Sequence, residues 1–330
     1  MLKKSFPRKF FDCCSGMGGS SLGFQLAGME CVGRCETDQK ADAVYETLMG
    51  KTIKNYGDIR KVIPADLPDF DVLVAGMDGQ PFSKIGFGLG ECDMRSHLFY
   101  SIFNILSIKK PSCCLFEFVD GILADEHEEY RTVLMRMLGL IGYEIKYGVL
   151  NTKTFGLPLA KNRFYIIGCR DGFSSGKISI ERREIPLESC LCDTDNIILN
   201  TTKSGWKEYL SKSNVRGYDV DALLREDFII FDRRATDFRI YRDVCPCLRS
   251  GNHGLFYTKN GQLRKISAYE AMLLQGVPKC IAEHLKTNAP VSKSRLLSMV
   301  GGMMPIPVAY CLANFINQNI LCSATSSVAA

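Results

Sequence analysis

The first 170 residues alternate short β-like runs with segments of helical spacing, and this alternation restricts the chain to one class of fold. The β-like runs are rich in Val, Ile, Phe, Tyr and Cys: FFDCC, ECVGRCE, DVLVAG, CCLFEFV, YEIKYGVL and FYIIGC. Between them, ADAVYETLM and RTVLMRMLGLIG have the apolar spacing of helices. Strand–helix alternation of this kind predicts an α/β fold with a mostly parallel sheet covered on both faces.

The pattern changes in the second half of the chain. From about residue 172 to residue 261 no long period is visible, which indicates a separate, smaller and irregular domain. The helical patterns ISAYEAMLLQG and PIPVAYCLANFINQNI then follow. We therefore predict one domain from residues 1–171 and 262–330, and a second from residues 172–261.

The composition and the N-terminal sequence indicate where in the cell the protein is located. The 330 residues are 46% hydrophobic, enough for a large core, and no stretch approaches the roughly 18 uninterrupted apolar residues of a membrane helix. The basic N-terminus lacks the apolar core of a secretory signal. We therefore expect no membrane association and an intracellular location, in the cytoplasm or, in a eukaryote, the nucleus.

Fifteen cysteines are present, and several lie in apolar runs, so we interpret them as buried free thiols rather than a disulfide framework. Cys190 and Cys192 form one C-x-C pair, and Cys245 and Cys247 form another. This is not the usual C-x-x-C spacing of a zinc site, so we expect no metal.

The sequence FFDCCSGMGGSSLGFQLAG places a strand, a glycine-rich turn and a helix in succession. Such turns allow a ligand to approach the backbone, although the G-x-G-G spacing differs from the dinucleotide fingerprint. Glu36 follows the turn by about 20 residues, where an acid reaches ribose hydroxyls in nucleoside-binding α/β folds. Asp58 falls near the end of the predicted third strand, where a carboxylate can accept from an adenine amino group. Each acid alone could be a solvated loop residue, but the ordered set predicts a nucleoside site.

Further motifs, in order along the chain, resemble those of the cytosine-C5 DNA methyltransferases. FFDCCSGMGG resembles the family's F-x-D-L-F-A-G-x-G-G, and GMDGQPFS resembles G-F-P-C-Q-P-F-S. DMRSHLF, FEFVDGI and FGLPLAKNRFYIIG are similar to the next three motifs. RKISAYEAMLLQGVP and VGGMMPIPVAYCLANFI resemble the last two. The resemblance covers most of the chain.

The resemblance implies a Rossmann-like methyltransferase fold, S-adenosyl-L-methionine as cofactor, and double-stranded DNA as partner, with residues 172–261 as the target-recognition domain. It also implies a set of cofactor-binding positions in the glycine-rich turn, at the strand ends and near the last helix. These positions are Asp12, Cys14, Gly16, Met17, Gly18, Gly19, Glu36, Thr37, Asp58, Ile59, Asp78, Leu98 and Gly302.

The catalytic positions of the family are only partly matched. A cysteine thiolate adds to C6 of a cytosine that has been flipped out of the duplex, a glutamate holds N3, and an arginine orients the ring. Glu117 and Arg163 occupy the glutamate and arginine positions, but Gly79 stands at the cysteine position. Met77 and Asp78 also depart from the family pattern, so the difference is broader than one residue. The sequence therefore predicts a cofactor- and DNA-binding homologue that is catalytically inactive or impaired.

Other departures concern both parts of the site: Cys14, Phe118, Leu159, Lys161 and Gly302 replace the family's usual residues. Lysine cannot reproduce the planar fork of arginine. The cofactor positions are nevertheless better matched than the catalytic ones.

Two alternatives remain open on the sequence. The chain could be an active cytosine-C5 methyltransferase whose nucleophile is displaced, to Cys92 or to Cys113 and Cys114, or is supplied by an active methyltransferase partner. It could also be an RNA or small-molecule methyltransferase on the same fold. The net charge of +5 permits a nucleic-acid partner. The basic stretch RRATDFRIYR suits phosphate contacts and base stacking, or is a solvated charged face.

Overall fold

The computed structural model describes residues 7–77, 98–174, 177–180, 183–195, 197–199, 220–233, 238–249 and 254–326. The chain forms two compact units. The first comprises Met1–Asn151, Asn162–Glu181 and Met304–Ala330, and the second comprises Thr152–Lys161 and Arg182–Met303. Each unit is considered by itself.

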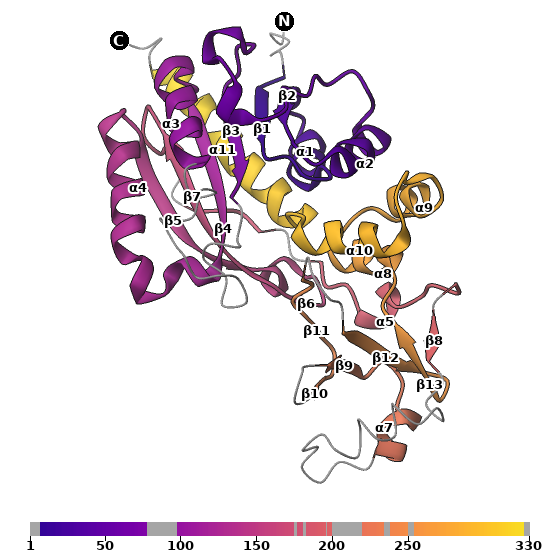
Figure 1. The fold of residues 1–330 in the computed structure, drawn as a ribbon. Helices are drawn as coiled ribbons and strands as arrows, with labels where there is room; N and C mark the ends of the chain where they lie inside the picture. The colour runs from indigo at the N-terminus through magenta and orange to yellow at the C-terminus, as the bar shows by residue number, and fades with distance from the viewer. Residues whose placement is uncertain are drawn as a thin grey trace, which may run out of the picture. The chain divides into compact units, whose positions relative to one another are not determined.

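A six-stranded sheet forms the centre of the first unit, with the strand order β2-β1-β3-β4-β7-β5 (Figure 1). Its strands are β1 (Lys9–Cys13), β2 (Glu30–Cys35), β3 (Val72–Gly76), β4 (Cys113–Val119), β5 (Glu144–Asn151) and β7 (Asn162–Cys169). Neighbours pair in parallel from β2 to β4, whereas β7 runs antiparallel to both β4 and β5. The predicted α/β fold with a mostly parallel sheet is confirmed.

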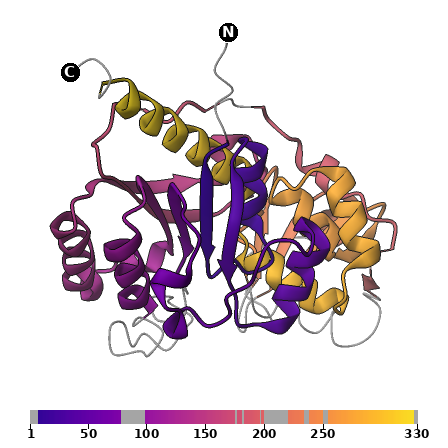
Figure 2. The same ribbon diagram turned by 90° about the horizontal axis from the view of Figure 1, so that it is seen from above.

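Helices cover both faces of this sheet (Figure 2). They are α1 (Gly19–Leu26), α2 (Gln39–Met49), α3 (Leu98–Lys109), α4 (Glu128–Leu140) and α11 (Ile306–Ser326). Because side chains alternate along a strand, Phe11 faces the core that α3 and α4 complete, while Phe10 packs against Phe24 of α1. Both phenylalanines are fully buried, as expected for a sheet covered on both faces.

Helix α1 lies against α11 at a point of close backbone approach. A Cβ atom added to Gly23 would overlap the Cβ of Ala309 and reach the backbone of Tyr310. The absence of a side chain at Gly23 therefore allows the close approach of α1 and α11.

The second unit contains a five-stranded antiparallel sheet, in the order β10-β9-β12-β13-β8, and a two-stranded parallel pair, β11-β6. Its strands are β6 (Leu159–Ala160), β8 (Ile198–Leu199), β9 (Ile230–Arg233), β10 (Phe238–Tyr241), β11 (Cys245–Pro246), β12 (Leu255–Lys259) and β13 (Gln262–Lys265). The helices are α5 (Leu187–Cys190), α7 (Val220–Arg225), α8 (Ala268–Leu274), α9 (Lys279–Asn288) and α10 (Lys293–Gly302).

Residues 172–261, which show no regular period in the sequence, thus supply most strands of the antiparallel sheet. These strands are only two to five residues long, too short for a period to be visible. Phe231 of β9 and Phe256 of β12 form a small core with Leu223 of α7, Ile229 just before β9 and Leu263 of β13.

The two compact units divide the chain differently from the two domains that the sequence predicts. Residues 262–303 fall in the second unit because β13 pairs with β12 and β8, and α8 packs with α9 and α10. The sequence groups them instead with residues 1–171. The domain boundaries proposed from the sequence stay a prediction.

Within the described parts of the chain, short 3-10 segments connect these elements at Ile59–Lys61, Pro64–Asp66, Asp120–Leu123, Asp125–His127 and Thr152–Phe155. Among the described residues, the stretch 293–320 is long and apolar enough to cross a membrane by length and composition alone. However, 78% of its most apolar window is buried within the protein, as in the core helix of a soluble protein.

The contact at Gly23 predicts that replacing this glycine by alanine destabilises the protein, although alanine has the higher helix propensity. Gly23→Ala should lower the free energy of unfolding by roughly 1–3 kcal/mol, because the new methyl group overpacks α1 against α11. The matched control is Gly139→Ala in α4, where a Cβ meets nothing within 4 Å. This substitution should raise stability by up to about 1 kcal/mol. Equilibrium urea unfolding would measure both, and equal effects of the two substitutions would contradict the prediction.

Candidate functional site

The carboxyl ends of β1, β2, β3 and β4 meet at one edge of the parallel part of the sheet. From β1 the chain proceeds to β2 on one side and later to β3 on the other side. In open α/β sheets, ligands bind at the carboxyl ends of the strands where the strand order reverses in this way. The glycine-rich turn directly follows β1 and therefore lies at this switch point.

The turn itself has an unusual backbone. Cys14, Gly16 and Gly18 have φ values of 59°, 53° and 96°, all in the left-handed region. The Ser15 N–H donates to the carbonyl of Cys35 at 3.0 Å, which ties the turn to β2. A Cβ atom at Gly16 would meet nothing within 4 Å, so the surface of the turn is open to a ligand at this point.

The carboxylate of Glu36 fixes the turn to the end of β2. Its Oε2 accepts the N–H of Gly16 at 2.7 Å, and its Oε1 accepts those of Thr37 and Asp38 at 2.8 Å each. A carboxylate has about four acceptor positions, so three hydrogen bonds leave capacity for one more donor. Glu36 is only partly buried, and a ligand hydroxyl can therefore reach it.

Asn55 is a residue of this region that the sequence does not point out. Its Oδ1 accepts the N–H groups of Glu36 at 3.0 Å and Gly57 at 2.9 Å. Its Nδ2 donates to the Glu36 carbonyl and to Asp42 Oδ1, both at 3.0 Å. In the sequence, only its position two residues before the Gly57–Asp58 pair connects Asn55 with the predicted site. That position does not reveal the groups to which the side chain is hydrogen-bonded.

The predicted third strand near Asp58 is reduced to one isolated parallel bridge between Arg34 and Asn55. Asp58 follows it and caps the 3-10 segment Ile59–Lys61. Its carboxylate is paired with Arg60, whose Nε and Nη2 donate at 2.9 and 2.8 Å. This pairing lowers the pKa of Asp58. We predict from the sequence that Asp58 accepts a hydrogen bond from an adenine amino group. In the structure, its carboxylate already accepts two hydrogen bonds from Arg60.

Asp12 lies beneath the turn and is completely buried. Its Oδ2 accepts the hydroxyls of Ser20 and Ser21 at 2.6 and 2.5 Å. Its Oδ1 has no hydrogen-bond partner among the described residues. Burial raises the pKa of Asp12 to about 6, against the opposing effect of the two serine hydroxyls.

Glu117 and Arg163, predicted from the resemblance, do come together. Glu117 lies on β4 and is 7% exposed, and the Arg163 Nε is 3.5 Å from its Oε1. The hydroxyl of Tyr165 donates to the same oxygen at 3.4 Å. Burial, together with the Glu117 charge, raises the pKa of Tyr165 well above its ordinary value, so its proton stays in place.

Glu117 is also next to the turn and to the end of β3. The Met77 N–H donates to the Glu117 carbonyl at 2.9 Å. A Cβ atom on Gly76 would lie 3.8 Å from the Cys14 carbonyl oxygen and 3.9 Å from Glu117 Oε2. The glycine turn and the Glu117–Arg163 pair are therefore separated by little more than the width of Gly76.

The other predicted positions have different surroundings. Met17 and Ile59 are buried, Thr37 is exposed, and Leu98 begins α3 and packs on the core of the first unit. Gly19 begins α1, and Gly302 is the exposed last residue of α10 in the second unit. Asp78, Gly79 and Cys92 lie outside the described residues.

The cysteines of β4 are core residues. Cys113 and Cys114 are 1% and 0% exposed. Burial raises the pKa of Cys114, and contact with the Cys169 thiol together with burial raises that of Cys113. The thiolate is the nucleophilic form of cysteine, so neither is prepared for nucleophilic attack at neutral pH. No three His, Cys, Asp or Glu residues in the described parts of the chain are grouped to hold a metal ion.

Lys161 and Leu159, which replace polar family residues, are both fully buried in the second unit. The Lys161 ammonium donates to the carbonyls of Met303 at 2.6 Å and Gly301 at 3.3 Å. Cations are favourable at helix C-termini, so Lys161 stabilises the end of α10.

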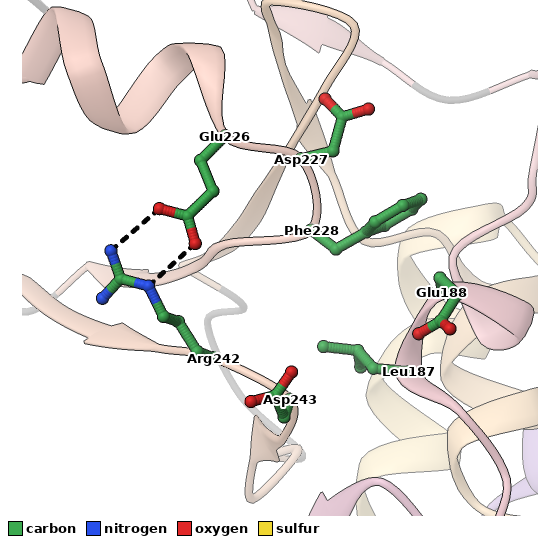
Figure 3. Close-up of a pocket in the computed structure, with 7 residues that line it drawn as sticks. All are labelled: Leu187, Glu188, Glu226, Asp227, Phe228, Arg242 and Asp243. Carbon is green, nitrogen blue, oxygen red and sulfur yellow. Dashed lines mark hydrogen bonds and ion pairs between the residues drawn. The ribbon is translucent and has the colours of Figure 1, made fainter.

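The second unit also has a cavity of about 230 Å³ lined by Leu187, Glu188, Glu226, Asp227, Phe228, Arg242 and Asp243 (Figure 3). Arg242 is paired with Glu226 through two hydrogen bonds of 2.9 and 3.0 Å. The remaining charged groups of the lining are acidic, which does not suit phosphate binding. None of the predicted site residues lines this cavity.

Comparison with known proteins agrees with the geometry of the first unit. The family described as C-5 cytosine-specific DNA methylase matches residues 8–318. The chain belongs to this family. Type II methyltransferase M.NgoBI of Neisseria gonorrhoeae is 40% identical over 314 residues, covering 91% of this chain and 90% of that protein. Type II methyltransferase M.HaeII of Haemophilus aegyptius is 30% identical over 310 residues, with 92% and 91% covered.

Solved structures of the same fold are more distant in sequence. S. pombe Dnmt2 methyltransferase has a TM-score of 0.68 at 18% identity, covering 95% of this chain and 99% of that one. Entamoeba histolytica methyltransferase EhMeth has a TM-score of 0.71 at 13% identity, covering 96% and 99%. These two likenesses establish the methyltransferase fold.

C-5 cytosine methylases use S-adenosyl-L-methionine, and the first unit fits that cofactor. The open surface at Gly16 leaves room for a ligand, and Glu36 retains an acceptor position for a hydroxyl. When bound, the cofactor would supply the methyl group. The chain's own contribution is the fixed turn and the carboxylates around it.

Burial of Asp12 predicts a specific pH dependence of stability. Between about pH 4 and pH 6 the folded state holds the Asp12 proton while the unfolded state releases it, so stability falls as the pH rises through this window. An asparagine at position 12 does not titrate, so the Asp12→Asn variant should not lose stability in this way. The difference in unfolding free energy between the variant and the parent chain should therefore shift in favour of the variant by up to about 3 kcal/mol from about pH 4 to pH 7. Urea unfolding at several pH values would measure this difference. An Asp12 carboxyl that titrates below about pH 4.5 by carbon NMR would contradict it.

Proposed function

We propose that this family member binds S-adenosyl-L-methionine and double-stranded DNA but is inactive or impaired in methyl transfer to cytosine. The single observation that carries the proposal is Gly79 in GMDGQPFS, at the position of the family's catalytic cysteine. The position lies outside the described residues, so the sequence alone supports this step.

The chemistry explains why that residue matters. Carbon 5 of cytosine is a poor nucleophile, and the family's reaction makes it reactive by adding a thiolate to carbon 6. The base must also leave the helical stack before any side chain can reach carbon 6. Glycine has no atom that can form the carbon–sulfur bond, and the neighbouring Asp78 is a weak nucleophile toward this carbon. Without the addition, methyl transfer to carbon 5 should be slow or absent.

The described part of the site supports retained cofactor and base binding. At the carboxyl end of β1, Glu36 is hydrogen-bonded to the turn through Gly16, and Asp12 is hydrogen-bonded to the start of α1 through Ser20 and Ser21. In the family the glutamate of this motif holds N3 of the flipped base, and here Glu117 is buried beside Arg163. These residues would bind and orient a cytosine whether or not a nucleophile follows.

Cys113 and Cys114 give little support to a displaced nucleophile. Cys113 and Cys114 are buried within β4, and their raised pKa values favour the thiol. Cys92, the other thiol considered from the sequence, lies outside the described residues. A nucleophile supplied by a partner methyltransferase stays a proposal for which a reconstituted mixture is the test.

DNA is the proposed partner because the two curated relatives reported above are named type II methyltransferases and the family description names DNA. In the second unit, Arg239 and Tyr241 lie on β10, with Arg239 exposed and Tyr241 partly exposed. These side chains suit phosphate contact and stacking. We place the protein inside the cell, where such DNA is available.

The decisive experiment is methyl transfer from labelled S-adenosyl-L-methionine to cytosine-containing duplex DNA, with RNA as a parallel substrate. The parent chain should bind the cofactor in calorimetry and transfer no label. Gly79→Cys, alone or with Asp78→Pro to restore the family's Pro-Cys pair, should create activity if only the nucleophile is missing. Gly79→Ser is the matched control, because it adds a side chain without a thiol.

Robust methylation of carbon 5 by the parent chain would overturn the proposal. So would a covalent link between one of its own cysteines and DNA that contains 5-fluorocytosine. Label transferred to RNA but not to DNA would favour the RNA methyltransferase alternative instead.

A further inference from the structure

The side chain of Asn55 connects the two loops that carry Glu36 and Asp58. An asparagine amide has two acceptor positions and two donor hydrogens. Here Oδ1 accepts from the backbone of Glu36 and of Gly57, and Nδ2 donates to the Glu36 carbonyl and to Asp42. All four bonds are 2.9–3.0 Å long. The amide is therefore fully used within one small region.

This connection is anchored to rigid elements. Asp42 lies on α2, and its Oδ1 is also ion-paired with Arg34 of β2. The Arg34 side chain is 1% exposed, and its guanidinium stacks over the Tyr45 ring at 4.0 Å. Asn55 thus holds its loop against a strand and a helix that the core fixes, rather than against another loop.

The bonds of Asn55 also complete the restraints on Glu36. The carboxylate of Glu36 is held by three backbone N–H groups, and its own backbone N–H and carbonyl are both held by Asn55. Because the same amide oxygen binds the Gly57 N–H, a shift of Glu36 is transmitted to the residue just before Asp58. The Asn55 side chain therefore contributes directly to the spacing between the two predicted cofactor carboxylates.

A purely structural role would not require this pattern. Arg34 already binds residues 54–56 through its backbone: the Arg34 N–H donates to Lys54, and the Tyr56 N–H donates to Arg34, at 3.0 and 2.8 Å. The segment is thus attached to β2 without the amide. The Asn55 side chain instead directs three of its four bonds to Glu36 and Gly57.

We propose that Asn55 is a positioning residue for the nucleoside end of the cofactor. It holds the Glu36 carboxylate where ribose hydroxyls reach it, and it sets the spacing from Glu36 to Asp58. The inference rests on the proposed role of Glu36 in binding ribose. It concerns selectivity for the sugar, which a general loss of stability would not change.

The test compares two ligands by isothermal titration calorimetry: S-adenosylhomocysteine and its 2′-deoxy analogue. The parent chain should bind the ribose form about tenfold more tightly, the lower end of the range for a hydrogen bond to a charged group. Glu36→Gln should abolish most of this preference. Asn55→Ala should reduce it to about threefold or less, because Glu36 is no longer held in place.

The matched control is Asn317→Ala, a partly buried asparagine of α11 whose amide donates to Ala27 at 3.4 Å, away from the turn. It should leave the ribose preference unchanged. If Asn55→Ala does not fold, Asn55→Asp replaces it. That side chain keeps the acceptor for the Glu36 and Gly57 N–H groups but places an oxygen against the Glu36 carbonyl and Asp42, so it should also lower the preference.

The two possible failures are distinguishable. If Glu36→Gln removes the preference but the Asn55 variants keep it, the positioning role is overturned, even when both ligands bind more weakly. If the parent chain shows no preference, or Glu36→Gln keeps it, the ribose role of Glu36 fails and the inference about Asn55 fails with it. A reduced preference in the Asn55 variants, with Asn317→Ala unchanged, supports the proposal.

Discussion

The carboxylate of Glu36, with its three backbone hydrogen bonds, is the interaction on which the nucleoside end of the site depends. It joins the turn after β1 to the loop after β2, two segments that the sheet places side by side. The three N–H groups lie at this edge, where strand pairing has ended, and the carboxylate supplies each of them with an acceptor. The same carboxylate therefore satisfies the backbone and presents a negative charge to a ligand. The capacity to bind a ligand thus follows from the arrangement of the loops at the ends of β1 and β2.

The strands of the first unit could be predicted from the sequence because their environment is uniform. A parallel sheet covered on both faces needs apolar side chains in both directions, so β1 and β4 are mostly apolar runs, interrupted by Asp12 and Glu117, that are easy to recognise. Glu117 and Arg163 could be paired in advance only through the resemblance. Their 46-residue separation is closed by the antiparallel pairing of β4 with β7, in which Val119 stands opposite Arg163.

Other parts of the site could not be predicted, and the reason is that they depend on tertiary neighbours. Asn55 acquires its role from the isolated bridge with Arg34 and from Asp42 on α2, which no local pattern reveals. Asp58 appeared as an available acceptor because its sequence position does not show that the Arg60 fork closes on it. In the second unit, β9 pairs with β12 across more than 20 residues, and strands this short carry no readable alternation.

The structure also separates what the fold needs from what the reaction needs. The turn, Glu36, Asn55 and Asp12 are bound into the backbone and core, so replacing any of them has consequences for the packing around β1 and β2. A catalytic thiol has no such structural role, because its function is nucleophilic attack on a substrate. Its loss removes one bond-forming atom and leaves the hydrogen-bond network around the cofactor intact. A chain of this family can therefore lose chemistry while keeping recognition, and the Glu117–Arg163 pair beside an intact turn is the arrangement that such a loss would leave.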